Sequence, residues 1–432
     1  MSKLLVFLID AMVSSDAAYM RTLPNFGWVL NGGAHVKVVQ PVFPALTYCC
    51  HTSILTGCYV NKHGIVQNEK LQRGAKVGVP WYCMKKDVQR KTVLDYAKER
   101  GKTICSISWP VSGGADYDFN LPMIVPYGYA GYNSRQYLEG ASTQELLDRY
   151  LYKHGRYLNG PGRSLDLFTM AMALDILQDY DQPDVMLVKM CDLDSYRHSF
   201  GVYDESTKVQ LRKHDEELGA LLESLRRKGT LEDTNILILG DHGHTDVNDI
   251  LLMNVLLKQN GFLTADEEGN VTDFEAFCHS NGLSGLVEIS RPNDVALQKK
   301  VRDFLEGLKT TPGIMLDFVM DAEEADKQLH YKGPFDFVIE SSLAIAFGET
   351  CRGNEIWGSR SPGDHKIGVA THGGGPTRFE GTTLFGRGPG FKQIEVPGPY
   401  SIVDEAPTMA KLLGFSMDAY DIDGKVIDEI LE

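Results

Sequence analysis

The stretch FPALTYCCHTSILTGCYVNKHGIVQN, from Phe43 to Asn68, places a hydroxyl residue, Thr47, at the start of a short helical pattern. The pattern predicts a helix from about Tyr48 to Thr56 that stops at Gly57, because glycine readily takes the left-handed conformation of a helix end. A helix N-terminus gathers unpaired N–H groups and the positive end of the helix dipole, so it favours a bound anion. Thr47 is therefore either a simple N-cap, the commoner use of such a residue, or a nucleophile aimed at a phosphate.

Around this stretch, apolar strand patterns alternate with amphipathic helical patterns, without paired hairpins. This alternation predicts an α/β fold with a mostly parallel central sheet and helices on both faces. The expected strands are Lys3–Ile9, Val36–Val39, Thr103–Ile107, Asp184–Lys189, Asn235–Leu239 and Thr382–Gly386. The expected further helices are Thr92–Arg100, Thr143–His154, Ser164–Asp179, Glu205–Lys228 and Ala406–Leu413.

The pattern changes over residues 246–365, which are more acidic and more mixed. Helical patterns at Asp249–Asn260 and Asp294–Leu308 lie among strand-like pieces at Gly285–Ile289 and Phe335–Ile339. We expect this segment to form an inserted cap subdomain in a catalytic core made of residues 1–245 and 366–432. The Gly- and Tyr-rich segment Ser112–Tyr137 is expected to be a long functional loop.

The composition is that of a globular protein, with 432 residues, 43% apolar residues and a formal net charge of −15. This acidic balance argues against binding to a nucleic-acid polymer, which needs a basic surface. It leaves open a small phosphate-ester substrate, because metal ions can supply local positive charge.

The eight cysteines form no CxxC pair and no regular framework, so we expect reduced, mostly buried thiols. The first apolar run, Leu4 to Ile9, ends at Asp10 and has no small-residue cleavage site, so it is typical of a buried strand and not of a signal peptide. No run approaches the length of a membrane span. We expect a cytoplasmic protein with no membrane partner.

Acidic and histidine residues follow three of the predicted strands. Asp10 follows the first strand, Asp194 and His198 follow Asp184–Lys189, and Asp241 and His242 follow Asn235–Leu239. The carboxyl ends of the strands in an open α/β sheet face the ligand site, so these side chains should meet at one edge. His372, in the glycine-rich sequence THGGG, is a further candidate.

Each of these residues has an ordinary structural role open to it, since aspartates often end turns and glycine-rich loops need no ligand. Carboxylates crowded at one sheet edge would nevertheless repel each other, and bound cations would remove the repulsion. Asp and His ligands suit zinc or another divalent transition metal. Six such side chains and Thr47 are enough for two ions of the kind that assist phosphoryl transfer.

These motifs resemble the alkaline phosphatase superfamily and, within it, the type I phosphodiesterase / nucleotide pyrophosphatase family. The resemblance covers roughly residues 1–245 and 366–432, and it is not clear over the inserted segment. The matching motifs are FPALT, TGCY and HGIVQN in the opening stretch, Trp109-Pro110, DSYRHSFG at 194–201 and GDHGH at 240–244.

The resemblance implies a role for each matching residue. Thr47 would be the nucleophile of a phosphothreonine intermediate, and Asn68 would donate to a phosphate oxygen. One metal would be held by Asp10, Thr47, Asp241 and His242, and the other by Asp194, His198 and His372. Both are expected to be Zn²⁺.

Five positions depart from the family pattern or leave it open. Ala11 stands where glycine is usual, Cys49-Cys50 where Pro-Asn is usual, and His244 where methionine is usual. For His244 we expect a supporting role and not a ligand role. His365 is an alternative to His372 as the third imidazole ligand.

The expected substrate pocket is walled by Trp109, by part of the inserted segment and by tyrosines of the long loop, Tyr117, Tyr127, Tyr129 and Tyr132. Packing under a loop is the alternative role of each of these aromatic residues. The leading function is hydrolysis of phosphodiester or pyrophosphate bonds, with a nucleotide as a possible substrate. The first alternative is phosphonate (phosphonoacetate-like) or phosphomonoester hydrolysis at the same site. The second is a non-catalytic, metal-stabilised binding protein.

Overall fold

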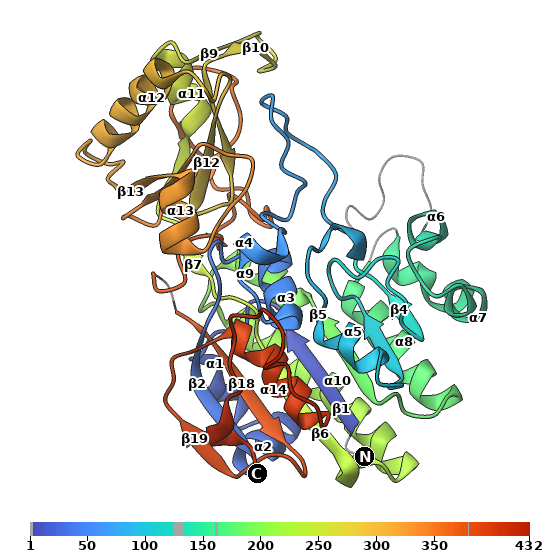
Figure 1. Ribbon diagram of the computed structural model, residues 1–432. Helices are drawn as coiled ribbons and strands as arrows, with labels where there is room; N and C mark the ends of the chain where they lie inside the picture. Colours follow the sequence, from blue (N-terminus) through green and yellow to red (C-terminus); the bar gives the residue numbers. More distant parts are fainter. Residues whose placement is uncertain (1–2, 125–133, 160–162, 379) are drawn as a thin grey trace.

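The centre of the molecule is a nine-stranded mixed sheet in the order β19-β2-β18-β6-β1-β5-β3-β4, with β20 beside β2 (Figure 1). The computed structural model describes residues 3–124, 134–159, 163–378 and 380–432. Strand β18 is antiparallel to both of its neighbours, and the other pairs in the sheet are parallel. The strands are β1 (Lys3–Ile9), β2 (Ala34–Gln40), β3 (Ile104–Ile107), β4 (Phe119–Leu121), β5 (Val185–Met190), β6 (Thr234–Leu239), β18 (Thr382–Arg387), β19 (Ile394–Val396) and β20 (Tyr400–Ser401).

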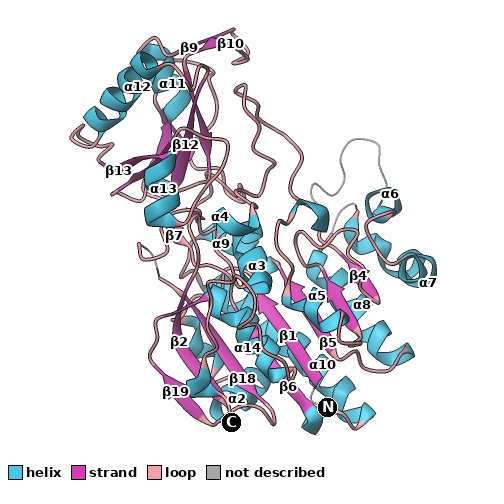
Figure 2. Cartoon of the chain, in the orientation of Figure 1, coloured by secondary structure: helices cyan, strands magenta, loops and turns pink. Residues whose placement is uncertain are grey.

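Helices cover both faces of this sheet (Figure 2). In β1, Leu4, Val6 and Leu8 belong to one hydrophobic core, which also holds residues of α3, α5 and α14, whereas Leu5, Phe7 and Ile9 belong to a second core with α2, α7, α8 and α10. This strict alternation follows from the two-residue period of a strand. The helices of this part are α1 (Asp16–Met20), α2 (Pro24–Asn31), α3 (Thr47–Thr56), α4 (Val60–His63), α5 (Val93–Lys98), α6 (Ser134–Leu138), α7 (Gln144–His154), α8 (Leu165–Asp179), α9 (Asp192–Phe200), α10 (Glu205–Lys228) and α14 (Glu405–Leu412).

The predicted fold class is confirmed. Strand β1 and helix α10 have the predicted bounds, and the other predicted strands and helices of this part are found within three residues of theirs. The loop expected over Ser112–Tyr137 is interrupted by β4 and by the start of α6. Strand β4 forms there because it extends the sheet edge beside β3.

The segment between β7 (Thr245–Asp246) and β17 (Ala370–Thr371) forms a unit with its own antiparallel sheet, in the order β11-β12-β14-β13. Figure 1 shows this inserted unit at the upper left, beyond the end of the central sheet. Strands β7 and β17 pair with each other where the chain leaves and returns. The unit contains β8 (Ile250–Leu252), α11 (Met253–Gln259), β9 (Leu263–Ala265), β10 (Val271–Phe274), β11 (Ala276–Ser280), β12 (Ser284–Ile289), α12 (Val295–Leu308), β13 (Leu316–Asp321), α13 (Ala322–Leu329), β14 (Phe337–Ser341), β15 (Ala346–Gly348) and β16 (Trp357–Gly358).

The inserted unit has a core of its own and also packs on the rest of the protein. Its sheet and helices enclose Phe277, Val287, Val301 and Ile339, among others. On the other side, the Tyr331 ring lies 5.2 Å from the Phe43 ring, edge to face. The unit therefore contacts the Thr47 stretch (Phe43–Asn68) directly.

The helix expected over Asp249–Asn260 is wrong in its first part. Ile250–Leu252 is strand β8, because it pairs with β15 and β16, and the helix α11 starts only at Met253.

All eight cysteines are free and seven of them are buried, as the sequence predicted, while Cys191 is half-buried. Within the described parts of the chain, no helix is both long enough and apolar enough to cross a bilayer.

Candidate active site

Thr47 is the first residue of helix α3, and its hydroxyl does not cap the helix. Leu46 is the N-cap residue, with extended backbone angles and no side-chain cap bond. The Thr47 Oγ1 atom lies 3.2 Å from His242 Nε2, so it faces the ends of the sheet strands. Gly57 ends the helix at a φ of +68°, as predicted. The capping role left open for Thr47 is therefore wrong.

The first group of possible metal ligands joins the ends of β1 and β6. It consists of Asp10, Asp241 and His242, whose ligand atoms lie within 4.8 Å of one another. His242 Nε2 is 3.5 Å from Asp10 Oδ1 and 3.2 Å from Asp241 Oδ2. Both of these carboxylate oxygens are buried and make no hydrogen bond. Unpartnered buried oxygens are costly, and a bound cation would satisfy them.

The two carboxylates of this group titrate in opposite directions. Burial and the charge of Asp241 raise the pKa of Asp10 well above its usual value. Burial also acts against ionisation of Asp241, but His242 and His51 outweigh it and lower the pKa of Asp241. One carboxyl of a crowded pair retains its proton more strongly, as expected when two like charges share a site.

Lys189, on β5, fixes the orientation of Asp10. Its Nζ atom lies 2.6 Å from Asp10 Oδ2 and 3.0 Å from Cys191 Sγ, and its side chain is completely buried. Because Oδ2 is held by this ion pair, Oδ1 is the oxygen that faces His242. Lys189 was not among the predicted site residues. A lysine within the apolar run of β5, VMLVKM, is the signal that could have found it.

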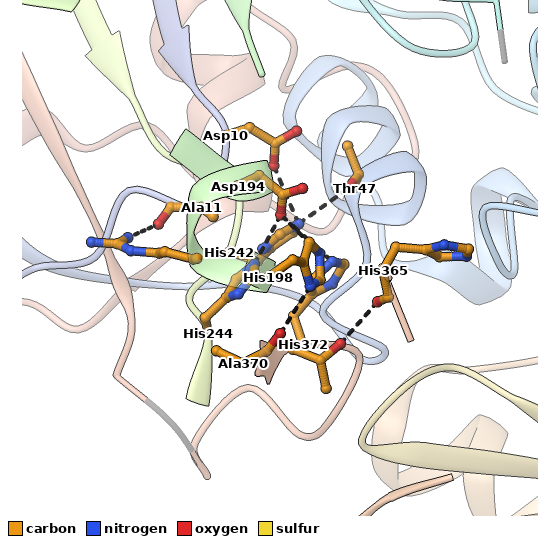
Figure 3. Close-up of polar contacts among 12 residues, drawn as sticks. Asp10, Ala11, Thr47, Asp194, His198, His242, His244, His365, Ala370 and His372 are labelled. Carbon is orange, nitrogen blue, oxygen red and sulfur yellow. Dashed lines mark hydrogen bonds and ion pairs between the residues drawn. The ribbon is translucent and has the colours of Figure 1, made fainter. Parts of the chain in front are cut away.

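The second group lies beside the first and contains Asp194, His198, His244 and His372 (Figure 3). The four-residue spacing on α9 brings His198 Nε2 to 3.4 Å from Asp194 Oδ1. His372 Nε2 is 3.7 Å and His244 Nε2 is 2.8 Å from the same oxygen. The sequence predicts only a supporting role for His244, and the structure places it among the four possible ligands.

Two rings of this group are fixed by backbone carbonyls. His198 Nδ1 lies 2.9 Å from Ala370 O, and His372 Nδ1 lies 2.9 Å from Ala45 O. A carbonyl only accepts, so each Nδ1 carries a proton, and the neutral ring then has its lone pair on Nε2. This arrangement is typical of metal-binding histidines, and His198 Nε2 is buried without a hydrogen bond.

Electrostatic effects differ among the residues of this group. Burial alone would raise the pKa of Asp194, but His198 and His244 hold it well below its usual value. Burial lowers the pKa of His244 to about 3, and burial together with His242 lowers the pKa of His372. Neutral imidazoles and ionised carboxylates are the forms that bind a metal.

His365 lies apart from both groups (Figure 3). Its side chain is 40% exposed, and its Nε2 is 3.8 Å from Glu69 Oε1. The His365 ring lies 5.2 Å from the Trp81 ring. Of the two histidines considered for the third imidazole ligand, only His372 is placed with the other candidates.

Asn68 lies next to the N-terminus of α3. Its Oδ1 accepts a hydrogen bond of 3.0 Å from the Tyr48 N–H, so its amide nitrogen is the donor left for a ligand. A small slot beside Thr47 is bounded by the Thr47 stretch, the inserted unit and the chain before β17. Its lining includes Leu46, Asn68, Glu69, Asn281, His365 and Lys366.

The charge of Lys366 in this slot is already balanced. Its Nζ atom lies 3.0 Å from Glu69 Oε1 and 2.9 Å from Glu349 Oε2. Burial opposes ionisation of Glu69, but His365 and Lys366 hold the pKa of this carboxyl at about 2. The slot therefore offers no net positive charge.

The aromatic residues predicted to wall the substrate pocket do not line one in the described structure. Trp109 is 1% exposed and packs edge-on against His51 at 4.8 Å, so it is a core residue and the prediction that it binds substrate is wrong. The apolar packing beneath α3 favours burial of the Trp109 ring over its exposure in a pocket. Tyr117 is buried as well. Tyr129, with Tyr127 and Tyr132, lies outside the described residues.

Cys49 and Cys50, where the family pattern fails, are fully buried in the core beneath α3. Burial raises the pKa of both thiols, so they are inert packing residues. His51, one turn after Thr47, lies with its Nδ1 2.7 Å from Thr47 O.

A third group, Asp166, His214 and Glu217, lies beside the start of α9. Asp166 accepts hydrogen bonds from the backbone N–H groups of Cys191 and Asp192, at 2.6 Å and 3.0 Å. Helix α9 has no cap from its own N-cap side chain, so Asp166 supplies the missing cap. It supports the helix that carries Asp194 and His198.

Comparisons with known proteins identify the family of the chain. The family model for type I phosphodiesterase / nucleotide pyrophosphatase matches residues 4–362, so it covers most of the inserted unit, where the sequence shows no clear family motif, and ends before His372. The bovine ectonucleotide pyrophosphatase/phosphodiesterase family member 3 is 24% identical over 244 residues, which are 55% of this chain and 24% of that protein. The rat family member 7 is 24% identical over 227 residues, 52% of this chain and 46% of that protein. The chain thus matches less than half the length of either relative.

Solved structures show the same fold. The mouse ectonucleotide pyrophosphatase/phosphodiesterase 5 has a TM-score of 0.69 at 19% identity, with both chains fully covered. The same mouse protein is also known as an inactive threonine-to-alanine variant in complex with AMP.

Proposed function

The chain belongs to the type I phosphodiesterase / nucleotide pyrophosphatase family, and from this we propose that it hydrolyses phosphodiester or pyrophosphate bonds of nucleotide-type substrates, through Thr47 and two divalent metal ions. The observation that carries the proposal is the convergence of unpartnered, buried ligand atoms beside a threonine hydroxyl that caps nothing. These atoms are Asp10 Oδ1, Asp241 Oδ2 and His198 Nε2.

The residues present fit two cations. Asp10, Asp241, His242 and Thr47 would hold one ion, and Asp194, His198 and His372 would hold the other, with His244 hydrogen-bonded to Asp194. Their nitrogen and oxygen donors suit Zn²⁺. When bound, two such ions would offset the carboxylate charges and stabilise the negative charge that develops on phosphoryl oxygens.

The protein itself positions the reacting groups. Helix α3 aims its N-terminal N–H groups and its dipole at the phosphate, and Thr47 Oγ1 attacks phosphorus while the bond to the leaving group breaks. Asn68, held by the Tyr48 N–H, donates its amide to a non-bridging oxygen. Water then cleaves the phosphothreonine and restores the hydroxyl.

The slot favours a diester over the alternative dianionic substrates. A phosphomonoester or a phosphonate carries one more negative charge than a diester at neutral pH, and a basic pocket would stabilise it. Lys366 cannot do so, because Glu69 and Glu349 already balance its charge. The neutral amide of Asn68 suits the single charge of a diester.

The test compares bis-p-nitrophenyl phosphate and a nucleotide p-nitrophenyl ester with p-nitrophenyl phosphate and phosphonoacetate, in zinc-loaded protein. We expect the diesters to be turned over faster. Thr47→Ala should lower kcat by about 10³-fold or more and abolish the acid-stable phospho-enzyme, whereas Thr47→Ser should keep both. Normal turnover by Thr47→Ala would disprove the mechanism. Two bound metals without a phospho-enzyme would favour the non-catalytic alternative.

A further inference from the structure

We propose that Asn281, in the inserted unit, is a positioning residue that ties the phosphate-binding side of the active site to the loop of the metal ligand His372. The assignment of roles to those two sides rests on the proposed function. Four buried groups form a continuous hydrogen-bond relay, Gln67–Asn281–Ser284–Gly373. Gln67 precedes Asn68, and Gly373 follows His372.

The contacts of the relay fix its direction. Gln67 Nε2 donates to the Ser280 carbonyl at 3.0 Å, so the same amide nitrogen must donate to Asn281 Oδ1, 2.7 Å away. Asn281 Nδ2 then donates to Ser284 Oγ at 3.1 Å. The Ser284 hydroxyl donates in turn to the Gly373 carbonyl at 2.6 Å. The relay ends at the Ser280 carbonyl on one side and at the Gly373 carbonyl on the other, and a carbonyl can only accept a hydrogen bond. Each donor between these two ends therefore has an acceptor.

These residues are almost completely buried. Gln67 is 3%, Asn281 2% and Ser284 0% exposed. Loss of one member would leave buried polar groups without partners, because solvent cannot replace the missing bond without entering the protein. The relay therefore resists small displacements of either end.

The backbones at the far end of the relay are in close contact. Leu283 N donates to His372 O at 3.0 Å, and a Cβ on Gly373 would lie 1.8 Å from Asn281 O. A Cβ on Gly282 would lie 2.5 Å from His372 O. The turn of the inserted unit at residues 280–284 thus forms one wall of the His372 loop, and glycines are required where the two chains meet.

Both ends of the relay also reach the Thr47 stretch. Gly373 N donates to Ala45 O at 2.9 Å, and the same carbonyl holds His372 Nδ1. The inserted unit therefore does more than cover the site. It sets the distance between the Asn68 side, which would contact the phosphate, and the His372 side, which would hold a metal ion.

The side chains of Asn281 and Gln67 also border the slot beside Thr47. Ser284 separates positioning from direct contact with substrate, because Ser284 does not line the slot and is reached only through Asn281. Gln67→Leu and Ser284→Ala interrupt the relay from opposite ends. Ser341→Ala is the matched control, since Ser341 is a buried serine of the same sheet whose hydroxyl donates to the Ile314 carbonyl at 2.8 Å and accepts from the Leu343 N–H at 3.2 Å, neither of which belongs to the relay.

The experiment is hydrogen–deuterium exchange of the metal-free and the zinc-loaded protein, read in peptides that cover residues 370–378. Gln67→Leu and Ser284→Ala should each speed exchange in these peptides by about threefold or more, although Gln67 does not contact the loop. The double variant should exceed neither single variant, because one interruption already opens the relay. Ser341→Ala should leave this exchange unchanged.

Kinetics add a second readout. Ser284→Ala should lower kcat on a diester by about tenfold with KM little changed, the usual size of effect for residues that support metal ligands. The relay would be disproved if residues 370–378 of Gln67→Leu exchanged at the wild-type rate. It would also be disproved if Ser341→Ala increased this exchange as much as the relay variants do. Absence of diester turnover in the wild type would instead count against the proposed function, while exchange in the metal-free protein would still decide the relay.

Discussion

Ala11 is held in a backbone conformation that suits glycine. Its φ is +61°, its N–H donates to Asp241 Oδ1 at 3.0 Å, and its carbonyl accepts from the Arg197 guanidinium. The residue cannot relax without releasing a carboxylate of the first ligand group. The departure from the family pattern noticed in the sequence is therefore a point of local strain beside Asp10.

Ala11→Gly should raise the free energy of unfolding by up to about 1 kcal/mol, because glycine takes positive φ without the Cβ penalty. Ala17→Gly is the control. Ala17 lies in helix α1, where the same exchange should cost about 1 kcal/mol. Urea unfolding at fixed metal concentration measures both. A loss of stability in Ala11→Gly as large as that in Ala17→Gly would refute the strain.

Lys189→Met should destabilise the metal-free protein by about 3 kcal/mol, since it removes the charged hydrogen-bond partner of the buried Asp10 carboxyl. Bound cations would replace that charge, so the loss should shrink when zinc is present in excess. Unfolding with chelator and with zinc gives the two values. Lys213→Met, at a half-exposed pair with Asp192, should show a small loss that zinc does not change. Equal losses with and without zinc in Lys189→Met would contradict this account.

At the residue scale, the sequence identified candidates that lie where strands end, because a parallel sheet gathers those positions at one edge. Asp10, Asp194 and Asp241 were found in this way. Lys189 was not, because its place inside an apolar strand gives no local sign of a charged partner on the next strand. Trp109 was misplaced for a related reason: an aromatic after a strand has the same local pattern whether it lines a pocket or packs under a helix.

Strand β14 of the inserted unit offers a test of pH dependence at the scale of elements. Its residue Glu340 accepts a hydrogen bond of 2.8 Å from Gly375 N and lies 3.2 Å from Arg378 Nε. Burial raises the pKa of Glu340 to about 7, Arg378 opposes the rise, and Asp317 adds to it. The folded protein therefore holds this proton more strongly than the unfolded chain does.

A raised carboxyl pKa contributes stability below the unfolded value, and this contribution is lost as the pH rises towards 7. Glu340→Gln imitates the protonated side chain. The variant should match the wild type near pH 5 and exceed its stability by about 3 kcal/mol at pH 8. Unfolding of metal-free protein at both pH values measures the difference. Glu355→Gln, at an exposed position, should show no such pH dependence. If the stability difference between Glu340→Gln and the wild type were the same at both pH values, the pKa of Glu340 would be ordinary.

Elements with strong periodicity were predictable, and those that depend on distant partners were not. Helix α10 has the predicted bounds because its 24 residues carry a clear apolar stripe and a C-terminal glycine. Strand β8 is three residues long and exists because β15 and β16, about one hundred residues later, pair with it. No local pattern carries that information.

On the scale of the whole molecule, the sequence indicated that residues 246–365 differ from the core but not how they join it. The packing of Tyr331 on Phe43 and the contacts of the 280–284 turn with the His372 loop depend on residues far apart in the chain. Such contacts produce no recognisable pattern in the spacing or composition of the sequence. The small slot lined by the Thr47 stretch, the inserted unit and the chain before β17 could not be predicted for the same reason.

The net charge of −15 predicts how salt should affect catalysis. Two divalent ions would offset only a small part of this charge, so an anionic substrate approaches against repulsion. The Debye length falls from about 30 Å at 0.01 M to about 10 Å at 0.1 M ionic strength, and over this range kcat/KM for a monoanionic diester should rise while kcat stays constant. A dianionic monoester should show a steeper rise. Initial rates in two inert salts separate this screening from binding of a particular ion. A fall in kcat/KM with salt would mean that the metal-bearing end of the sheet attracts the substrate more strongly than the acidic surface repels it.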